Sequence, residues 1–256
     1  MPKSIIYYHR AYRKLTSSNW VFGLELIVET LPITLAILLL YPFITRQMSL
    51  ITQVILSSYY PTDTIKVIEK SFLLGNVSLV TIVCGYPKAL TSLINFIVSM
   101  GLIILLPRVR KAKNIAIFVI FLAAVNLTSA MYFTLSLFEF PYTGTEFSEH
   151  YVKSEVSIWL FIPFILGVAF VPLPGPFFPK MVLVVLTVIY SVIVGILRYA
   201  IFLFIISKSS VIYMALLFFA FGPLSDFVYI VGIYCFYASK LAHKLKGSES
   251  VWKWVY

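Results

Sequence analysis

The sequence predicts an all-α integral membrane protein with about six transmembrane helices. Of its 256 residues, 61% are hydrophobic and only 12% are charged, whereas about a quarter of the residues of a soluble domain are charged. Several apolar runs reach the roughly 20 residues that an α-helix needs to cross the hydrocarbon core. None shows the short alternating pattern of a membrane β-barrel strand. The predicted spans are therefore helices.

Six spans follow from the length of the apolar runs and from the charged residues between them. They cover residues 20–43, 89–106, 114–136, 157–173, 181–206 and 211–238, within one membrane domain, 1–256. Four Lys or Arg residues precede the first span, four lie in "PRVRKAK" and four follow Ser239. Because loops rich in Lys and Arg stay in the cytoplasm, both termini are expected on the cytoplasmic side. The membrane is expected to be the plasma membrane of the cell.

The first span is preceded by residues 1–19, which include "KSIIYYHRAYRKLT". Apolar side chains on one face and basic side chains on the other predict an amphipathic helix on the cytoplasmic surface. At the other end, residues 239–256 form a basic cytoplasmic tail. Anionic lipid head groups are the expected partners of this basic face. Nucleic acid remains an alternative for a chain with a net charge of +10.

The longest predicted connection, residues 44–88, lies on the outer side. Leu50, Ile51, Val54 and Ile55 recur at helical spacing, which predicts an interfacial helix. The stretch "SFLLGNVSLVTIVCGYPK" that follows is apolar but too short to span. It predicts a re-entrant or half-buried segment that protein must cover.

The first span carries Glu25 and Glu29, one helical turn apart on one face. Ionisable side chains inside a membrane are costly unless they pair or reach water, so they mark candidate functional sites. A cation or a proton could be held between these two acids. In the alternative interpretation, Glu25 sits among the head groups and Glu29 pairs with a basic neighbour.

The fifth and sixth spans carry Arg198 and Asp226. Counting from the turn between the spans places Arg198 level with Phe219, whose carbonyl loses its helical partner because Pro223 has no amide hydrogen. We expect Arg198 to donate to that carbonyl and to reach Asp226. A translocation path would then run among spans one, five and six, although a structural pairing makes the same geometric demand.

Asn95 and Asn126, in the second and third spans, are expected to form hydrogen bonds between helices. These polar positions would help the second and third spans to pack.

A thiol enzyme is an alternative interpretation of the outer face. Cys84, Asn126, Ser129 and His150 lie in "VCGYPKALTSLINF", "AVNLTSAMYF" and "SEHYVKSE". In order and approximate spacing these stretches resemble the exosortases and archaeosortases, which are membrane cysteine transpeptidases. The resemblance implies Cys84 as nucleophile and His150 as its partner, because a nearby histidine activates a thiol. That family has arginine where this sequence has Ser129.

The sequence shows no motif typical of a metal-binding or cofactor-binding site. The three histidines, His9, His150 and His243, are far apart in sequence, and no paired His or Cys spacing of a metal site occurs. No Walker-type glycine loop is present. We therefore expect no metal, no cofactor and no ATPase domain.

The leading interpretation is a membrane subunit of a transport, secretion or macromolecule-translocation complex, with other membrane subunits as partners and a separate ATPase as a further candidate partner. The alternatives are the membrane cysteine transpeptidase and a purely structural scaffold.

Overall fold

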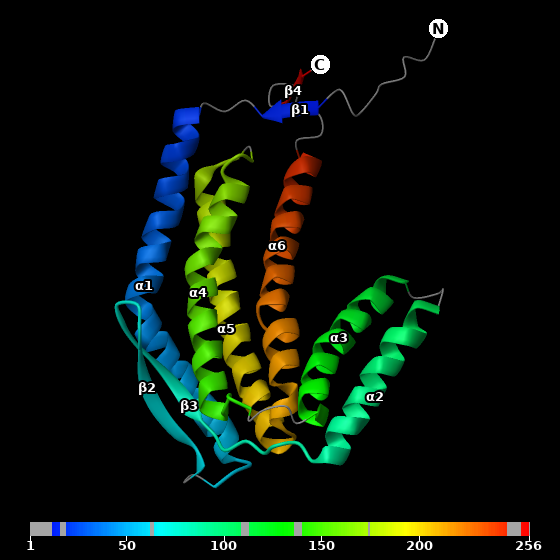
Figure 1. Ribbon diagram of the computed structural model, residues 1–256. Coiled ribbons are helices and arrows are strands. Elements are labelled where there is room, and N and C mark those ends of the chain that lie inside the picture. Colours follow the sequence, from blue (N-terminus) through cyan, green and yellow to red (C-terminus); the bar gives the residue numbers. More distant parts are fainter. Residues whose placement is uncertain are drawn as a thin grey trace. The chain divides into compact units, whose positions relative to one another are not determined.

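The computed structural model describes residues 12–15, 19–61, 64–108, 113–135, 140–173, 175–244 and 252–255. Six helical segments among them are long and apolar enough to cross a membrane (Figure 1). The helices are α1 (Asn19–Ser57), α2 (Ala89–Leu105), α3 (Lys113–Leu135), α4 (Gly144–Phe170), α5 (Phe177–Lys208) and α6 (Pro223–Lys244). The length and apolar composition of these helices confirm the prediction of a multi-pass helical membrane protein.

Two helices extend far beyond the bounds that the sequence predicts, and α5 (Phe177–Lys208) extends a few residues past its predicted span at each end. The first continues to Ser57, and α4 begins at Gly144 instead of at residue 157. A capping box explains the early start of α4, because the Thr143 amide donates to Glu146 Oε2 (2.7 Å) and the Glu146 amide donates to the Thr143 hydroxyl (3.3 Å). Residues 144–156, predicted as an outer loop, are therefore helical.

The segment 44–88 differs most from its prediction. Residues 44–57 continue α1 and form no separate interfacial helix. Strands β2 (Lys66–Phe72) and β3 (Gly75–Thr81) then form an antiparallel hairpin where a re-entrant segment was expected. The physical reason is a two-residue turn, Leu73–Leu74, between stretches rich in β-branched residues, which favour strands.

The terminal segments also contain strands. β1 (Tyr12–Leu15) pairs antiparallel with β4 (Trp252–Val255). The amphipathic helix predicted for residues 1–19 is therefore wrong at Tyr12–Leu15, and its residues 1–11 and 16–18 lie outside the described residues. In the predicted basic tail, 239–256, α6 continues to Lys244. The prediction of an all-α chain thus holds for the spans and fails for these two strand pairs.

The chain divides into two compact units. Unit 1 comprises Met1–Ile37, Trp159–Tyr190 and Val228–Tyr256. Inside it α1 and α4 pack closely, since a Cβ at Gly167 would lie 2.5 Å from Cγ2 of Thr30. The Lys180 ammonium donates to the Leu173 carbonyl (2.6 Å), which ties the start of α5 to the end of α4.

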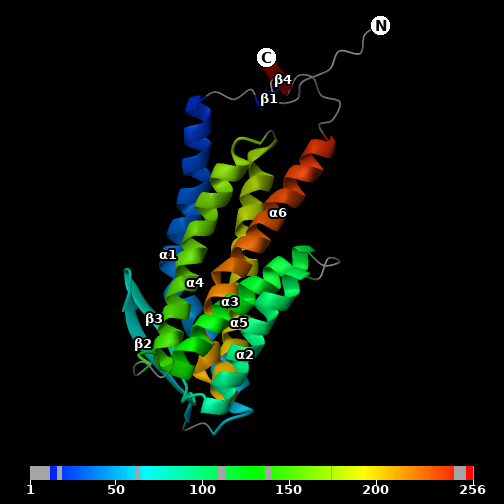
Figure 2. The ribbon, with the colours of Figure 1, turned by 45° about the vertical axis from the view of Figure 1, so that its right-hand side comes forward.

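Unit 2 comprises Leu38–Ile158 and Ser191–Phe227. Its β-hairpin lies beside the C-terminal half of α1 (Figures 1 and 2). The Ser49 hydroxyl donates to the Ser78 carbonyl (2.7 Å) on β3, whose Val80 amide donates to the Tyr199 hydroxyl (2.8 Å) on α5. Four consecutive residues of β3, 77–80, are buried by this packing. The segment is thus a hairpin packed on α1 and α5, and its partial burial in the membrane stays a prediction.

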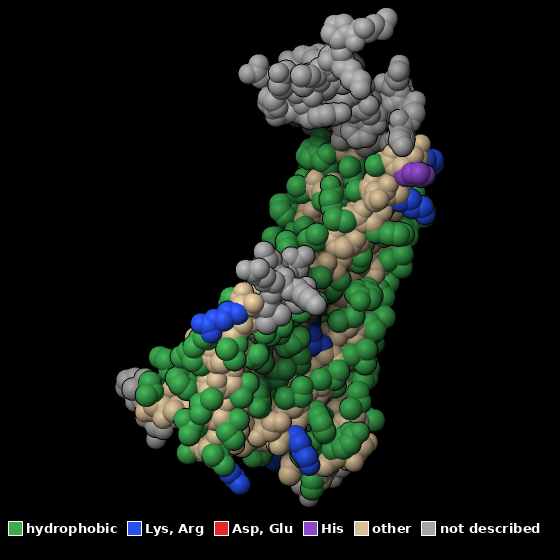
Figure 3. Space-filling view, turned by 90° about the vertical axis from the view of Figure 1, so that its right-hand side faces the viewer, with side chains coloured by type: hydrophobic (Ala, Val, Ile, Leu, Met, Phe, Trp, Pro, Cys, Tyr) green, Lys and Arg blue, Asp and Glu red, His purple; other side chains and the backbone are tan. Residues whose placement is uncertain are grey.

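The described helices expose large apolar side chains. Leu39, Leu90 and Ile117 are 77%, 68% and 70% exposed. In the view of Figure 3, hydrophobic side chains cover most of the described helical surface. Such a surface is stable against lipid chains and would be unfavourable in water.

Candidate functional site

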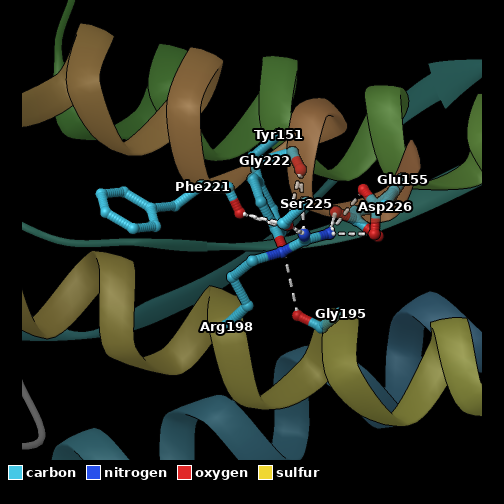
Figure 4. Close-up of polar contacts among 8 residues, drawn as sticks. All are labelled: Tyr151, Glu155, Gly195, Arg198, Phe221, Gly222, Ser225 and Asp226. Atoms are coloured by element: carbon cyan, nitrogen blue, oxygen red, sulfur yellow. Dashed lines mark hydrogen bonds and ion pairs between the residues drawn. The ribbon is translucent and has the colours of Figure 1, made fainter. Parts of the chain in front are cut away.

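The strongest concentration of buried charge lies in unit 2, where three helices converge on Arg198. Arg198 comes from α5, Glu155 from α4 and Asp226 from the first turn of α6 (Figure 4). Arg198 is 7% exposed, and the two acids are 1% exposed each. We call these residues, with Tyr151 and Ser225, the arginine cluster.

A break in the helical chain before α6 supplies further acceptors. Residues Val211–Tyr213 form a 3₁₀ turn (η4) and Leu216–Ala220 form a π-helical turn (η5). Regular α-helix cannot continue through Gly222 and Pro223, because proline lacks an amide hydrogen. A side chain at residue 222 would overlap the Phe218 carbonyl, so the close turn requires glycine. The helix restarts at Pro223, a favoured first helical residue.

The guanidinium group of Arg198 is hydrogen-bonded on every side. Nη1 donates to the carbonyls of Phe221 and Gly222 (3.0 Å each) and to the Ser225 hydroxyl. Nη2 donates to both carboxylate oxygens of Asp226 (3.0 and 2.8 Å) and to Glu155.

The remaining donor, Nε, bonds the Tyr151 hydroxyl (2.8 Å), which in turn donates to the Gly195 carbonyl (3.2 Å). Arg198 thereby connects α4, α5 and the start of α6.

The cluster contains more acid than base. One guanidinium faces two carboxylates, so two ionised acids would leave a net charge of −1 in a buried site. Oε2 of Glu155 is buried and has no hydrogen-bond partner within the described part of the chain. An unpaired buried charge is strongly unfavourable. The arrangement is therefore suited to binding one positive charge, as a proton or a small cation.

The structure places the predicted pair, Arg198 and Asp226, in direct contact. The carbonyl acceptors are those of Phe221 and Gly222, just after the π-helical turn, and not that of Phe219. The sequence prediction missed the contribution of Glu155, which it assigned to an outer loop. The capping box at Thr143–Glu146 is the signal that would have extended α4 and brought Glu155 into the span.

Glu25 and Glu29 lie in unit 1, whereas Arg198 and Asp226 lie in unit 2. Glu29 is fully buried, and neither of its carboxylate oxygens has a hydrogen-bond partner among the described residues. Lys180 interacts electrostatically with both glutamates. Glu29 is thus a second buried acid with a basic neighbour, but its carboxylate oxygens form no hydrogen bond among the described residues, so its pairing with a basic residue stays a prediction.

Asn95 and Asn126 link helices of unit 2. The Asn126 amide donates to Oδ1 of Asn95 (3.2 Å) and to the Ser99 hydroxyl (2.9 Å), which joins α3 to α2. The Asn95 amide donates to the Tyr213 hydroxyl (3.3 Å) on η4. The contacts are those expected of residues that pack helices.

Cys84 lies just after β3 and packs against the start of α4. Its Sγ donates to the Ile82 carbonyl (3.6 Å), and a Cβ at Gly144 would lie 2.5 Å from the sulfur atom. Burial raises the pKa of the Cys84 thiol to about 11. The thiol form therefore predominates near neutral pH, and the thiol is a weak nucleophile there.

His150 is exposed on α4, with its ring 6.0 Å from the ring of Tyr142. Together with Ser129 it lines a cavity of about 310 Å³. The structure thus brings Ser129 and His150 to one cavity.

No protein-family model, curated protein or solved structure matches this chain. Within the described residues, no group of three or more His, Cys, Asp or Glu side chains is arranged to hold a metal ion. Fold and site together define a multi-pass membrane protein with a buried ionic cluster at a broken helix. Its function is argued from that cluster.

Proposed function

We propose that this chain is a membrane-embedded transport subunit whose arginine cluster binds and releases one proton as a substrate crosses the membrane. The observation that carries the proposal is the pairing of one guanidinium with two buried carboxylates at a helix break. Intramembrane acids of this kind are typical of proton relays in pumps and transporters.

The charge balance favours a proton as the bound species. With one proton on the acid pair, the cluster is neutral and every strong charge has a partner. Without it, the surplus negative charge must be met by water or by a cation from the substrate path. Proton binding and substrate binding would therefore be linked through the same two carboxylates.

The helix break gives this change of charge a mechanical consequence. Arg198 holds the carbonyls of Phe221 and Gly222, which belong to the irregular turn between η5 and α6. Broken helices at membrane depth commonly form the binding sites of transporters. A change in the hold of Arg198 on this turn would alter the link among α4, α5 and α6.

The proposal includes partners and orientation. The chain would lie in the plasma membrane with both termini in the cytoplasm, as the distribution of basic residues predicts. The exposed apolar faces of α2 and α3 would contact lipid and neighbouring subunits, and energy would come from the proton gradient or from a separate ATPase. Copurification in mild detergent, followed by mass spectrometry, tests the presence of these subunits.

The cysteine transpeptidase interpretation has less support. Cys84 carries a raised pKa, which works against a thiolate nucleophile at neutral pH. Arg198, the cation that could replace the arginine missing at Ser129, is fully engaged by the arginine cluster.

Charge movement in response to a pH jump tests proton binding without knowledge of the substrate. Proteoliposomes of each variant are adsorbed on a solid-supported membrane, and the transient current after a pH step is recorded. We expect a current for the wild type that is lost in Glu155→Gln and in Asp226→Asn.

Glu149→Gln is the matched control, because Glu149 lies on the same helix in a partly exposed ion pair with Lys153. It should retain the current. Equal currents from all four proteins, or no current from the wild type, would contradict the proposal.

A further inference from the structure

A cavity of about 310 Å³ lies in unit 2, where α3 and α4 meet the irregular segment before α6. Five of the ten residues that line it are Phe or Tyr: Phe140, Tyr142, Phe147, Phe218 and Phe219. We call it the aromatic cavity. Its volume is at the lower end of the range for sites of small molecules. A molecule of one or two rings fits a space of this size.

Three side chains that line the aromatic cavity carry polar groups: Ser129, His150 and, through its hydroxyl, Tyr142. Ser129, on α3, and His150, on α4, can each donate or accept a hydrogen bond. The described residues that line the cavity include no Lys, Arg, Asp or Glu. A charged ligand would lose its hydration without gaining a counter-charge. The lining therefore favours an uncharged molecule with an apolar body and one hydrogen-bonding group.

The aromatic cavity is accessible from its surroundings. Tyr142 and Phe219 are 47% and 60% exposed, although both line it. A ligand could thus enter from the outer interface or from the lipid without unfolding the helices around it. Met214, which also lines the wall, can adapt to ligands of somewhat different shape because its side chain is flexible.

The aromatic cavity is structurally connected to the arginine cluster. Phe218 and Phe219 belong to η5, and the carbonyl of nearby Phe221 is held by Arg198. On α4, the ring of Phe147 stacks on that of Tyr151 at 6.3 Å between centroids, and Tyr151 accepts a hydrogen bond from Arg198. A ligand that moves Phe147 or Phe219 would therefore act on the segments that hold Tyr151 and Phe221, two of the residues that Arg198 bonds.

We infer that the aromatic cavity binds an uncharged, flat, apolar small molecule with a single hydrogen-bonding group. Its role as the substrate site of a proton-linked cycle rests on the function proposed above, whereas the binding itself can be tested alone.

Photolabelling of the intact protein in nanodiscs tests the binding. The probe is a trifluoromethyl-diazirine derivative of benzyl alcohol, which has one ring and one hydroxyl group. Labelled peptides are identified and quantified by mass spectrometry. We expect labelling of the 211–221 and 140–150 segments that falls when excess 4-tert-butylbenzyl alcohol competes, while labelling of exposed positions such as Leu90 does not fall.

Ala215→Phe adds a ring inside the aromatic cavity, and Ala124→Phe adds the same ring at an exposed position of α3. The first substitution should reduce the competable labelling about tenfold, equivalent to about 1.4 kcal/mol of binding free energy, and the second should leave it unchanged. Both variants are checked for monodisperse elution. The competition experiment on the wild type needs no variant, so a misfolded Ala215→Phe protein would not remove the test.

Three results would overturn the inference. Labelling of these segments that no competitor reduces would show simple partition into lipid. Equal competable labelling in Ala215→Phe would place the site elsewhere. Stronger competition by benzyltrimethylammonium than by the alcohol would indicate an organic-cation site, formed by the aromatic rings alone.

The two proposals can fail separately. Competable labelling without a pH-jump current would leave the binding site standing and refute the proton cycle. A current that needs Glu155 and Asp226, together with non-competable labelling, would leave the proton cycle standing and refute the aromatic cavity as a substrate site.

Discussion

Replacing Arg198 with methionine removes the positive charge and the guanidinium donors of the arginine cluster while keeping an apolar side chain of similar length. Glu155 and Asp226 then remain, each 1% exposed, with no guanidinium between them. Removing one partner of a buried ion pair destabilises a protein by about 3–5 kcal/mol. At about 2–4 °C per kcal/mol for a chain of roughly this size, the unfolding midpoint should fall by about 6–20 °C.

The assay is the fraction of protein that remains monodisperse after heating in detergent, followed by size-exclusion chromatography. Lys153→Met is the matched control, because Lys153 forms a surface pair with Glu149 at 2.6 Å and both side chains are partly exposed. A surface pair of this kind contributes about 0–1 kcal/mol. Its loss should lower the midpoint by at most about 4 °C.

A triple variant separates loss of charge balance from loss of packing. In Arg198→Met combined with Glu155→Gln and Asp226→Asn, the buried charges are gone together, and replacing a whole buried ion pair is often close to neutral. The triple variant should therefore be more stable than Arg198→Met alone. The reasoning is refuted if Arg198→Met is as stable as the Lys153→Met control, or if the triple variant is no more stable than the single one.

Burial keeps Cys84 protonated below its pKa of about 11, so alkylation by iodoacetamide, followed by mass spectrometry, should accelerate about tenfold per pH unit between pH 7 and 10; a plateau near pH 8 would contradict the burial argument. Asn126→Ala should lose about 0.6–1.7 kcal/mol, measured as a lower thermal midpoint, and Thr128→Ala, at an exposed position of the same helix, should match the wild type. Gly222→Ala should destabilise the fold by about 1–3 kcal/mol because its new methyl group overlaps a backbone carbonyl. Gly101→Ala, with no atom near the new methyl group, should be neutral or more stable by up to about 1 kcal/mol in the same thermal assay.

The six spans are predictable because the bilayer imposes one simple demand on the sequence. A helix that crosses hydrocarbon needs a long apolar run, and each of the six runs is visible without any tertiary information. The ends of the helices are set by local capping and packing. For this reason α4 begins at the capping box of Thr143 and Glu146, although the apolar run starts later.

The β2–β3 hairpin was not predictable from the same signal. Short apolar stretches of strand and of buried helix look alike in sequence. What decides the matter is tertiary: the Tyr41 hydroxyl bonds the Phe72 carbonyl (2.5 Å), and Ser49 bonds Ser78 across the packing surface with α1. The turn of the hairpin is made by Leu73 and Leu74. Because it lacks the Asn-Gly or Asp-Gly pair that is usual in two-residue hairpin turns, the sequence carried no hairpin signal at this point.

Two of the five residues of the arginine cluster, Arg198 and Asp226, were predicted from the sequence. Counting residues from the turn between two antiparallel helices brings Arg198 to the level of Phe219, from where it was expected to reach Asp226. The same counting says nothing about Glu155, because Glu155 lies on α4, outside the hairpin that contains Arg198 and Asp226. Its place in the cluster depends on how α4 packs against α5, which only the assembled unit 2 reveals.

The second acid is the feature that a purely structural role does not explain. One carboxylate, that of Asp226, already neutralises Arg198, and the Phe221 and Gly222 carbonyls that Arg198 bonds also accept from the Ser225 hydroxyl. Glu155 places a further negative charge in the same buried space, and its Oε2 has no hydrogen-bond partner among the described residues. For stability alone, glutamine at this position would serve as well or better. The function proposed above gives this second carboxylate a role, because a carboxylate can bind and release a proton whereas the amide of glutamine cannot.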